Sequence, residues 1–241
     1  MSTRTLTTRA PTPTRHGARG AQRAEPGSER VAQCWPAAIV RAAMRVFHRE
    51  HAGRPIRVAW MLEELGEPYE LCVLTREEGA GEEHRARHPL GRVPVIEDDV
   101  GFVFESAAIC LHLADLHPDA GLAPAPGTHD RALVYQWTVF APAELEPPLI
   151  EAAMHATRDP ERAAKARRRF DAASGAVSDA LGERDHLVGA RFTVADVLVG
   201  TALAFTARVG FAEELPHKLT RYLARLAERP AYLRALERTS A

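Results

Sequence analysis

The chain has 241 residues, of which 26% are charged, and a formal net charge of −1 at pH 7. This length allows one large domain or two small ones, with a core that needs no disulfide or metal. The balanced charge gives no basic field, which argues against a nucleic-acid partner. No stretch approaches the roughly 18 apolar residues of a membrane span, and the three cysteines form no CxxC pair. We therefore expect a soluble, cytoplasmic protein that binds neither nucleic acid nor membrane.

Residues 1–43 differ in composition from the rest of the chain. Thr, Arg, Pro and Gly dominate this stretch, and it lacks apolar periodicity until 35–40. Such a composition predicts a disordered tail, or an extension preceding a start at Met44. An Arg-rich, acid-poor transit peptide is the alternative. In each case this segment does not contribute to the predicted fold.

Residues 44–120 alternate between strand and helix signals. The predicted elements are a strand at 45–48, a helix at 55–65, a strand at 69–74, a polar helical stretch at 77–88, a two-stranded hairpin at 93–104 and a helix at 107–117. Pro55 suits the first turn of its helix, and Gly66 suits the end. The order predicts a mixed four-stranded sheet covered by helices, which is an α/β domain.

Residues 121–241 lack strand signals and form the predicted all-helical domain. The predicted helices are 128–156, 160–181, 193–209 and 218–238, with proline interruptions at positions 142, 147, 148, 216 and 230. Thr193 and Asp196 have the spacing of a capping box, which we interpret as structural.

Two short motifs in the first domain suggest a ligand site. Pro94 cannot donate a ladder hydrogen bond, so it suits the first position of its strand, where an X-Pro bond can be cis and leave the Val93 backbone to a ligand. Eleven residues after Pro94 comes Glu105-Ser106. Ser106 can cap a helix that begins near Ala107, where unpaired amide groups attract a carboxylate. Alone, Glu105-Ser106 would be an ordinary helix cap.

Four segments of the chain together form a recognisable set: 57–70 (RVAWMLEELGEPYE), 88–94 (HPLGRVP), 105–109 (ESAAI) and 192–196 (FTVAD). Through these segments the chain, from Met44 to its C-terminus, resembles the cytosolic glutathione transferases, in particular bacterial members. The resemblance implies a thioredoxin-like domain followed by a helical bundle. It also implies a homodimer, glutathione as co-substrate, and no prosthetic group.

The resemblance also implies the roles of five residues. The backbone of Val93, next to Pro94, would pair with the cysteinyl part of glutathione in a strand-like manner. Ser106 and the helix amides after it would bind the γ-glutamyl carboxylate, and Glu105 would bind the ammonium group. Arg92 would contact the glycyl carboxylate.

The turn before the first helix departs from the family pattern. Members of the family usually carry Tyr, Ser or Cys there, but residues 48–55 read HREHAGRP, with Gly53 and Arg54 where other members have Ser and Arg. Glutathione supplies its own thiol, so the protein only needs to lower the pKa of that thiol. We hypothesise that the Gly53 amide, with Arg54 or His51, stabilises the thiolate.

Other site interpretations are weaker. Tyr135 and Phe140 are candidates for the acceptor pocket, but core packing or dimer contacts would explain Phe140 and its neighbour Trp137 equally well. His48 and His51 lack further ligands for a metal, so we predict no metal site. Glu63 and Glu64 are interpreted as solvated helix carboxylates.

The predicted function is that of a glutathione transferase, in which the glutathione thiolate reacts with a small electrophilic or peroxide acceptor. The alternative is a non-catalytic binding module with the same fold. The missing hydroxyl favours the module, whereas the intact Val93-Pro94 and Glu105-Ser106 motifs favour the enzyme.

Overall fold

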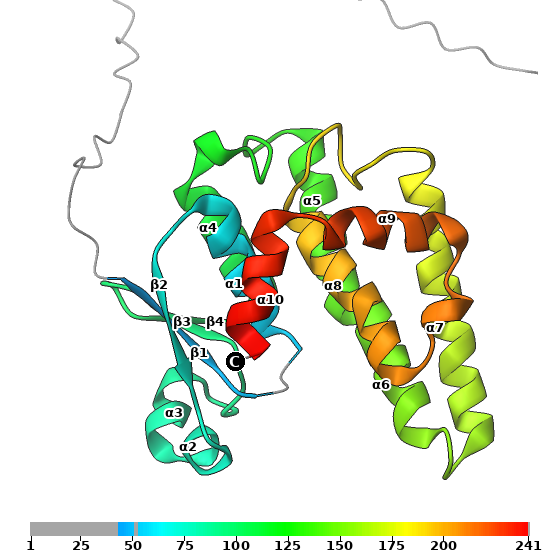
Figure 1. Ribbon diagram of the computed structural model, residues 1–241, viewed down its shortest axis with the longest axis horizontal. Coiled ribbons are helices and arrows are strands. Elements are labelled where there is room, and N and C mark those ends of the chain that lie inside the picture. The colour runs from blue at the N-terminus through cyan, green and yellow to red at the C-terminus, as the bar shows by residue number, and fades with distance from the viewer. Residues whose placement is uncertain (1–42, 51–52, 241) are drawn as a thin grey trace, which may run out of the picture. The chain divides into compact units, whose positions relative to one another are not determined.

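The four predicted strands form one mixed sheet in the computed structural model, which describes residues 43–50 and 53–240 (Figure 1). The strand order is β2-β1-β3-β4, with β1 parallel to β2 and the other neighbours antiparallel. The elements here are β1 (Met44–His48), α1 (Pro55–Leu65), β2 (Tyr69–Val73), α2 (Arg76–Ala80), α3 (Glu82–Arg87), β3 (Val95–Glu97), β4 (Phe102–Phe104) and α4 (Ser106–Leu116). The predicted fold class of this part is confirmed. The predicted tail, apart from Ala43, and the candidate His51 lie outside the described residues.

Strand β1 lies inside the sheet with both of its faces covered. Successive side chains of a strand point to opposite faces, and Val46 and Phe47 are only 0% and 1% exposed. The Phe47 ring lies 6.2 Å from the ring of His84 in α3, measured between centroids. Val46 belongs instead to the hydrophobic core that includes residues of α1 and α4. In Figure 1, α2 and α3 lie well apart from α4.

Local sequence signals account for both ends of α1. Pro55 occupies the first turn, where a missing N–H leaves no helical hydrogen bond unmade. Gly66 ends the helix in the left-handed conformation, with φ at 68°, and its N–H donates to the Leu62 carbonyl.

The second part of the chain is helical, as predicted. Its helices are α5 (His129–Phe140), α6 (Glu146–His155), α7 (Pro160–Leu181), α8 (Val194–Val209), α9 (His217–Ala227) and α10 (Pro230–Ser240). A π-helical turn, Ala141–Leu145, joins α5 to α6 and contains Pro142, which has no N–H to give to a regular α-helix. Short 3₁₀ turns lie at Pro118–Ala120 and Ala212–Glu214. In the part of the chain that the structure describes, no helix combines the length and apolar character needed to cross a membrane.

The buried carboxylate of Asp196 organises the start of α8. It accepts hydrogen bonds from the Thr193 amide (2.9 Å), the Leu187 amide (2.9 Å) and the Tyr222 hydroxyl (2.8 Å). Asp196 is 0% exposed, so these donors replace the water that a buried carboxylate would otherwise lack. The interpretation of Thr193 and Asp196 as a structural capping pair is consistent with these bonds.

The C-terminal helix α10 and the residue before it are fixed to α1 by charged side chains. Arg229 donates to both carboxylate oxygens of Glu64, at 2.6 and 2.8 Å, and Arg234 donates to Glu63 at 2.7 Å. The side chains of Glu63 and Glu64 are each only 12% exposed. The interpretation of these two residues as solvated carboxylates was therefore wrong, because their arginine partners lie more than 160 residues away in the sequence.

Two glycine substitutions test the packing, one next to the ligand motifs and one in α7. Gly91 has φ at +60°, and a Cβ atom there would lie 2.8 Å from the Gly79 carbonyl oxygen. Gly91→Ala is therefore expected to destabilise the fold by about 1–3 kcal/mol. Gly175→Ala in α7, where a Cβ would meet nothing within 4 Å, should instead stabilise it by about 0.5–1 kcal/mol. Urea unfolding midpoints measure both, and equal shifts of the same sign would contradict the packing described.

Candidate functional site

The hairpin of β3 and β4 brings the two ligand motifs together. Val95 pairs with Phe104 in the antiparallel ladder. The cis peptide bond between Val93 and Pro94 comes just before β3, and Glu105-Ser106 comes just after β4. Because the two strands are antiparallel, these four predicted site residues lie at the same end of the hairpin.

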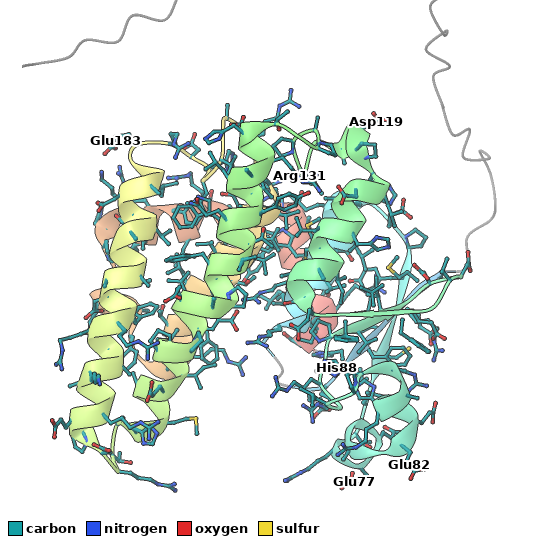
Figure 2. The ribbon with its side chains drawn as sticks, turned by 180° about the vertical axis from the view of Figure 1, so that it is seen from behind. Glu77, Glu82, His88, Asp119, Arg131 and Glu183 are labelled. Carbon is teal, nitrogen blue, oxygen red and sulfur yellow. The ribbon has the colours of Figure 1, made fainter. Side chains whose placement is uncertain are left out.

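Two buried histidines hold the turn that precedes Pro94. His84 lies with its Nε2 atom 2.9 Å from the Arg92 carbonyl oxygen, to which it donates. His88 accepts from the Leu90 amide through Nδ1 (3.0 Å) and packs its ring 4.6 Å from that of Phe104. Burial lowers the pKa of His88, which keeps the ring neutral and able to accept. Figure 2 shows His88 beside the hairpin, and the neighbouring Arg92 is exposed.

Helix α4 begins one residue earlier than predicted. Ser106 is its first residue, and Glu105 occupies the N-cap position with φ at 69° and no side-chain cap bond. The prediction that Ser106 caps a helix from Ala107 was therefore wrong. The Ser106 hydroxyl instead accepts a hydrogen bond from Arg57 at 3.2 Å. The first amides of α4 still lack helical acceptors, so this end of the helix attracts negative charge.

Arg57, which the sequence analysis did not select, connects this helix end to the helical part of the chain. Its Nε atom donates to the Thr201 hydroxyl in α8 at 2.7 Å. Its Nη1 atom donates to Ser106 in α4, and its Nη2 atom donates to Glu146 in α6. The Arg57 side chain is only 3% exposed. One guanidinium thus contacts three helices through its planar set of donors.

The Glu146 carboxylate is shared between two arginines. Arg54 donates to its Oε2 atom from Nε (2.8 Å) and Nη2 (2.6 Å), while Arg57 donates to Oε1. Burial alone would raise the pKa of Glu146, but the charges and hydrogen bonds of Arg57 and Arg54 outweigh it and lower that pKa. Glu146 therefore stays ionised at neutral pH. Arg54, proposed as a thiolate-stabilising residue, has two of its nitrogens committed to this carboxylate.

The turn between β1 and α1 borders a cavity of about 680 Å³. Gly53, Ile56 and His48 lie on its wall, together with Phe205 of α8 and Leu236 of α10. Burial is the main effect on the pKa of His48 and lowers it, against the smaller effect of the Thr239 carbonyl. The imidazole is therefore neutral at pH 7.

The two candidate acceptor residues lie on α5. Tyr135 is 44% exposed, with the Arg131 guanidinium 4.8 Å from the centre of its ring. Phe140 packs edge-on against Trp137, with 5.2 Å between ring centroids. Neither Tyr135 nor Phe140 is on the wall of the cavity at Gly53. Their contact with an acceptor stays a prediction.

The sequence gives only a weak indication that Arg57 and Glu146 are buried. Arg57 precedes Val58, Ala59 and Trp60, all of which are buried, and Glu146 follows buried Leu145. A charged residue on an otherwise apolar helix face suggests a buried partner. The sequence alone does not show that these two residues, 89 positions apart, are each other's partners.

Comparison with known proteins supports the same assignment for both parts of the chain. The family model described as the glutathione S-transferase N-terminal domain matches residues 56–121, and the C-terminal domain model matches residues 155–237. The solved glutathione S-transferase of a sphingomonad, complexed with glutathione, is 31% identical; the match covers 81% of this chain and 98% of that one, with a TM-score of 0.71. The glutathione transferase URE2P8 from Phanerochaete chrysosporium, with oxidized glutathione, has a TM-score of 0.74 over 81% and 94% of the two chains. At 21% identity this second likeness shows the fold alone.

The curated relatives also include proteins that are not named glutathione S-transferase. Elongation factor 1-gamma of Trypanosoma cruzi is 35% identical over 142 residues, which are 59% of this chain and 34% of that protein. The chain spans between 34% and 43% of the first curated relatives that it matches. The two domain models, together with the sphingomonad relative, show that this chain belongs to the glutathione S-transferase family.

Proposed function

We propose that this protein is a glutathione-dependent transferase that binds glutathione at the end of the β3–β4 hairpin. The observation that carries the proposal is that Val93, next to the cis Pro94, lies at the same end of the hairpin as Glu105 and Ser106 at the start of α4. A relative that is 31% identical and similar over nearly its full length was solved with glutathione bound.

The charges at this end of the hairpin suit the charges of the tripeptide. The exposed Glu105 carboxylate can bind the γ-glutamyl ammonium group, and the α4 amides with Ser106 can bind the adjacent carboxylate. The Val93 backbone can pair with the cysteinyl part. Arg92, exposed beside it, can bind the glycyl carboxylate.

The thiol is proposed to lie at the turn of Gly53 and Arg54. Among the described residues of this turn, backbone donors are few, since Pro55 has no N–H and the Arg57 amide donates to the Arg54 carbonyl at 3.1 Å. The amides of Gly53 and Ile56 and the positive end of α1 would lower the thiol pKa from its usual value of about 8.5. Arg54 would contribute less than an unpaired arginine, because Glu146 shares its charge.

The cavity beside Gly53 is the proposed acceptor site. Its volume of about 680 Å³ lies within the range of small-molecule sites, about 300–1,000 Å³. Apolar side chains such as Phe205 and Leu236 would hold the acceptor while the thiolate sulfur attacks its electrophilic atom or peroxide oxygen. Tyr135 and Phe140 would need to act from outside this cavity.

A non-catalytic binding module is the second candidate. It is favoured by the absence of Tyr, Ser and Cys from residues 48–50 and 53–55 as the structure describes them, and by the match to elongation factor 1-gamma. The exposed apolar side chains of Val100 and Phe102 on the hairpin, 96% and 43% exposed, suit a protein interface.

Three further properties belong to the proposal. They are a cytoplasmic location, homodimerisation and a domain boundary near residue 120.

Glutathione binding and turnover test the proposal directly. We expect the wild-type chain to bind glutathione in isothermal titration calorimetry, and Glu105→Gln to weaken binding about tenfold by removing a charged partner of the ammonium group. Glu82→Gln, on the exposed surface of α3 (Figure 2), is the matched control and should change nothing. Absence of binding by the wild-type chain would refute the proposal. Binding without turnover of any electrophile or hydroperoxide would favour the module.

A hydroxyl restored at position 53 tests the thiol site. A Cβ atom at Gly53 would have its nearest neighbour, Arg208 Nη1, at 3.9 Å, so a serine fits. Gly53→Ser is expected to lower the pKa of the bound thiol and to raise kcat about tenfold, by one hydrogen bond to the thiolate. Gly53→Ala should do neither, and His48→Gln should leave the thiol pKa unchanged because His48 is neutral. Thiolate absorbance against pH measures the effect; equal pKa values for the Ser and Ala variants would place the sulfur elsewhere.

A further inference from the structure

The Arg57 guanidinium determines which way the Ser106 hydroxyl can donate. A hydroxyl has one proton and two acceptor positions. Since Arg57 Nη1 donates to the Ser106 oxygen at 3.2 Å, the serine proton must point away from the guanidinium. The hydroxyl is therefore kept as a donor for an acceptor at the start of α4. A donation from a cation also polarises the hydroxyl and strengthens its own donation.

The charges around Arg57 do not balance. Arg54 and Arg57 together face the single carboxylate of Glu146, which leaves one net positive charge in this group. The side chains of Arg57 and Glu146 are 3% and 7% exposed, so water screens the Arg57 charge poorly. Arg54 is 38% exposed and its charge is partly screened. An anion bound beside Ser106 would balance the net positive charge.

The site thus has three separate sources of attraction for a carboxylate. The first is the amide groups at the start of α4, the second is the Ser106 hydroxyl with its proton directed outward, and the third is the excess charge behind that hydroxyl. Only the first depends on α4 alone. The other two depend on Arg57, which belongs to α1.

We propose that Arg57 is a positioning residue for the γ-glutamyl carboxylate of glutathione: it orients the Ser106 hydroxyl toward that carboxylate and supplies buried positive charge behind it. This inference rests on the proposed function, because it assumes that glutathione binds at α4. Arg57 does not touch the ligand in this proposal. It acts through Ser106 and through its electric field.

A structural role alone predicts a different result. Arg57 also holds α4, α6 and α8 together through Ser106, Glu146 and Thr201, so its loss will destabilise the fold. Such a loss would weaken binding of every ligand at the site by a similar factor. A role in carboxylate binding predicts weaker binding only for ligands that have the carboxylate.

Two ligands separate these roles. One is glutathione, and the other is 4-aminobutyryl-cysteinyl-glycine, which is glutathione without the γ-glutamyl α-carboxylate. Arg57→Met is expected to weaken glutathione binding by about 10- to 100-fold, the range for hydrogen bonds to a charged group. Binding of the analogue should change by less than about threefold on the same grounds. Calorimetry or fluorescence titration gives both dissociation constants.

Arg131→Met is the matched control. Arg131 is also buried, at 3% exposure, and bonds to Asp115 near the other end of α4 (Figure 2). Loss of Arg131 should lower the urea unfolding midpoint. The ratio of glutathione affinity to analogue affinity should stay as in the wild-type chain. If Arg57→Met does not fold, Arg57→Lys and Ser106→Ala carry the test, since each should lower the glutathione affinity relative to the analogue.

The outcomes distinguish the two proposals. If the wild-type chain binds neither ligand, the proposed function fails and this inference fails with it. A second outcome is that the wild-type chain binds glutathione, but the ratio of its affinity for glutathione to its affinity for the analogue is unchanged in the Arg57 variants and in Ser106→Ala. The role of Arg57 is then purely structural, and only this inference is overturned. If the ratio of glutathione affinity to analogue affinity falls in the Arg57 variants and in Ser106→Ala, but not in Arg131→Met, the inference is supported.

Discussion

The Glu146 carboxylate, buried between the guanidiniums of Arg54 and Arg57, joins the sheet part of the chain to the helical part. Removing a lone carboxylate or guanidinium from water costs several kcal/mol, so each of these groups can be buried only where the others meet it. Their meeting sets the position of α1 relative to α6. Because Arg57 also reaches α4 and α8, the same contacts place the start of α4, which is the proposed ligand-binding helix.

This arrangement explains how the protein could bind glutathione well and still lack the usual catalytic hydroxyl. The groups proposed to hold the tripeptide lie on the hairpin and at the start of α4, and they depend on backbone geometry and on Arg57. The groups proposed to hold the sulfur lie at Gly53, in a different turn. The two sets of groups lie on different elements, but the Glu146 carboxylate links them, because it accepts hydrogen bonds from both Arg54 and Arg57. Both the enzyme and the binding module are compatible with an intact tripeptide site.

The sequence predicted the elements well because their signals are local. Pro55, Gly66 and the pair Thr193 and Asp196 act within one helical turn of their own position, and each marks a helix end in the structure. The location of Val93 and Ser106 at one end of the hairpin was also predictable, since a hairpin brings together residues that are close in sequence.

What the sequence did not predict depends on partners that lie far along the chain. Glu63 and Glu64 look like surface residues until α10 supplies their arginines. Ser106 looks like a helix cap until Arg57 occupies its oxygen. In each case the sequence shows the residue type, but it does not show the distant residue that the side chain contacts. Tertiary contacts between distant charged residues leave no periodic pattern, which is why local reasoning failed at these positions.

The attachment of α10 bears on how the shape of the proposed acceptor cavity could vary. Arg229, just before α10, and Arg234 of α10 pair with carboxylates of α1, whereas Leu236 of α10 lines the cavity at Gly53. Arg238 does both, since it lines the cavity and donates to the Tyr69 carbonyl at 3.0 Å. Exchange of Leu236 can alter which molecules fit, and the ion pairs of Arg229 and Arg234 will still seat the helix.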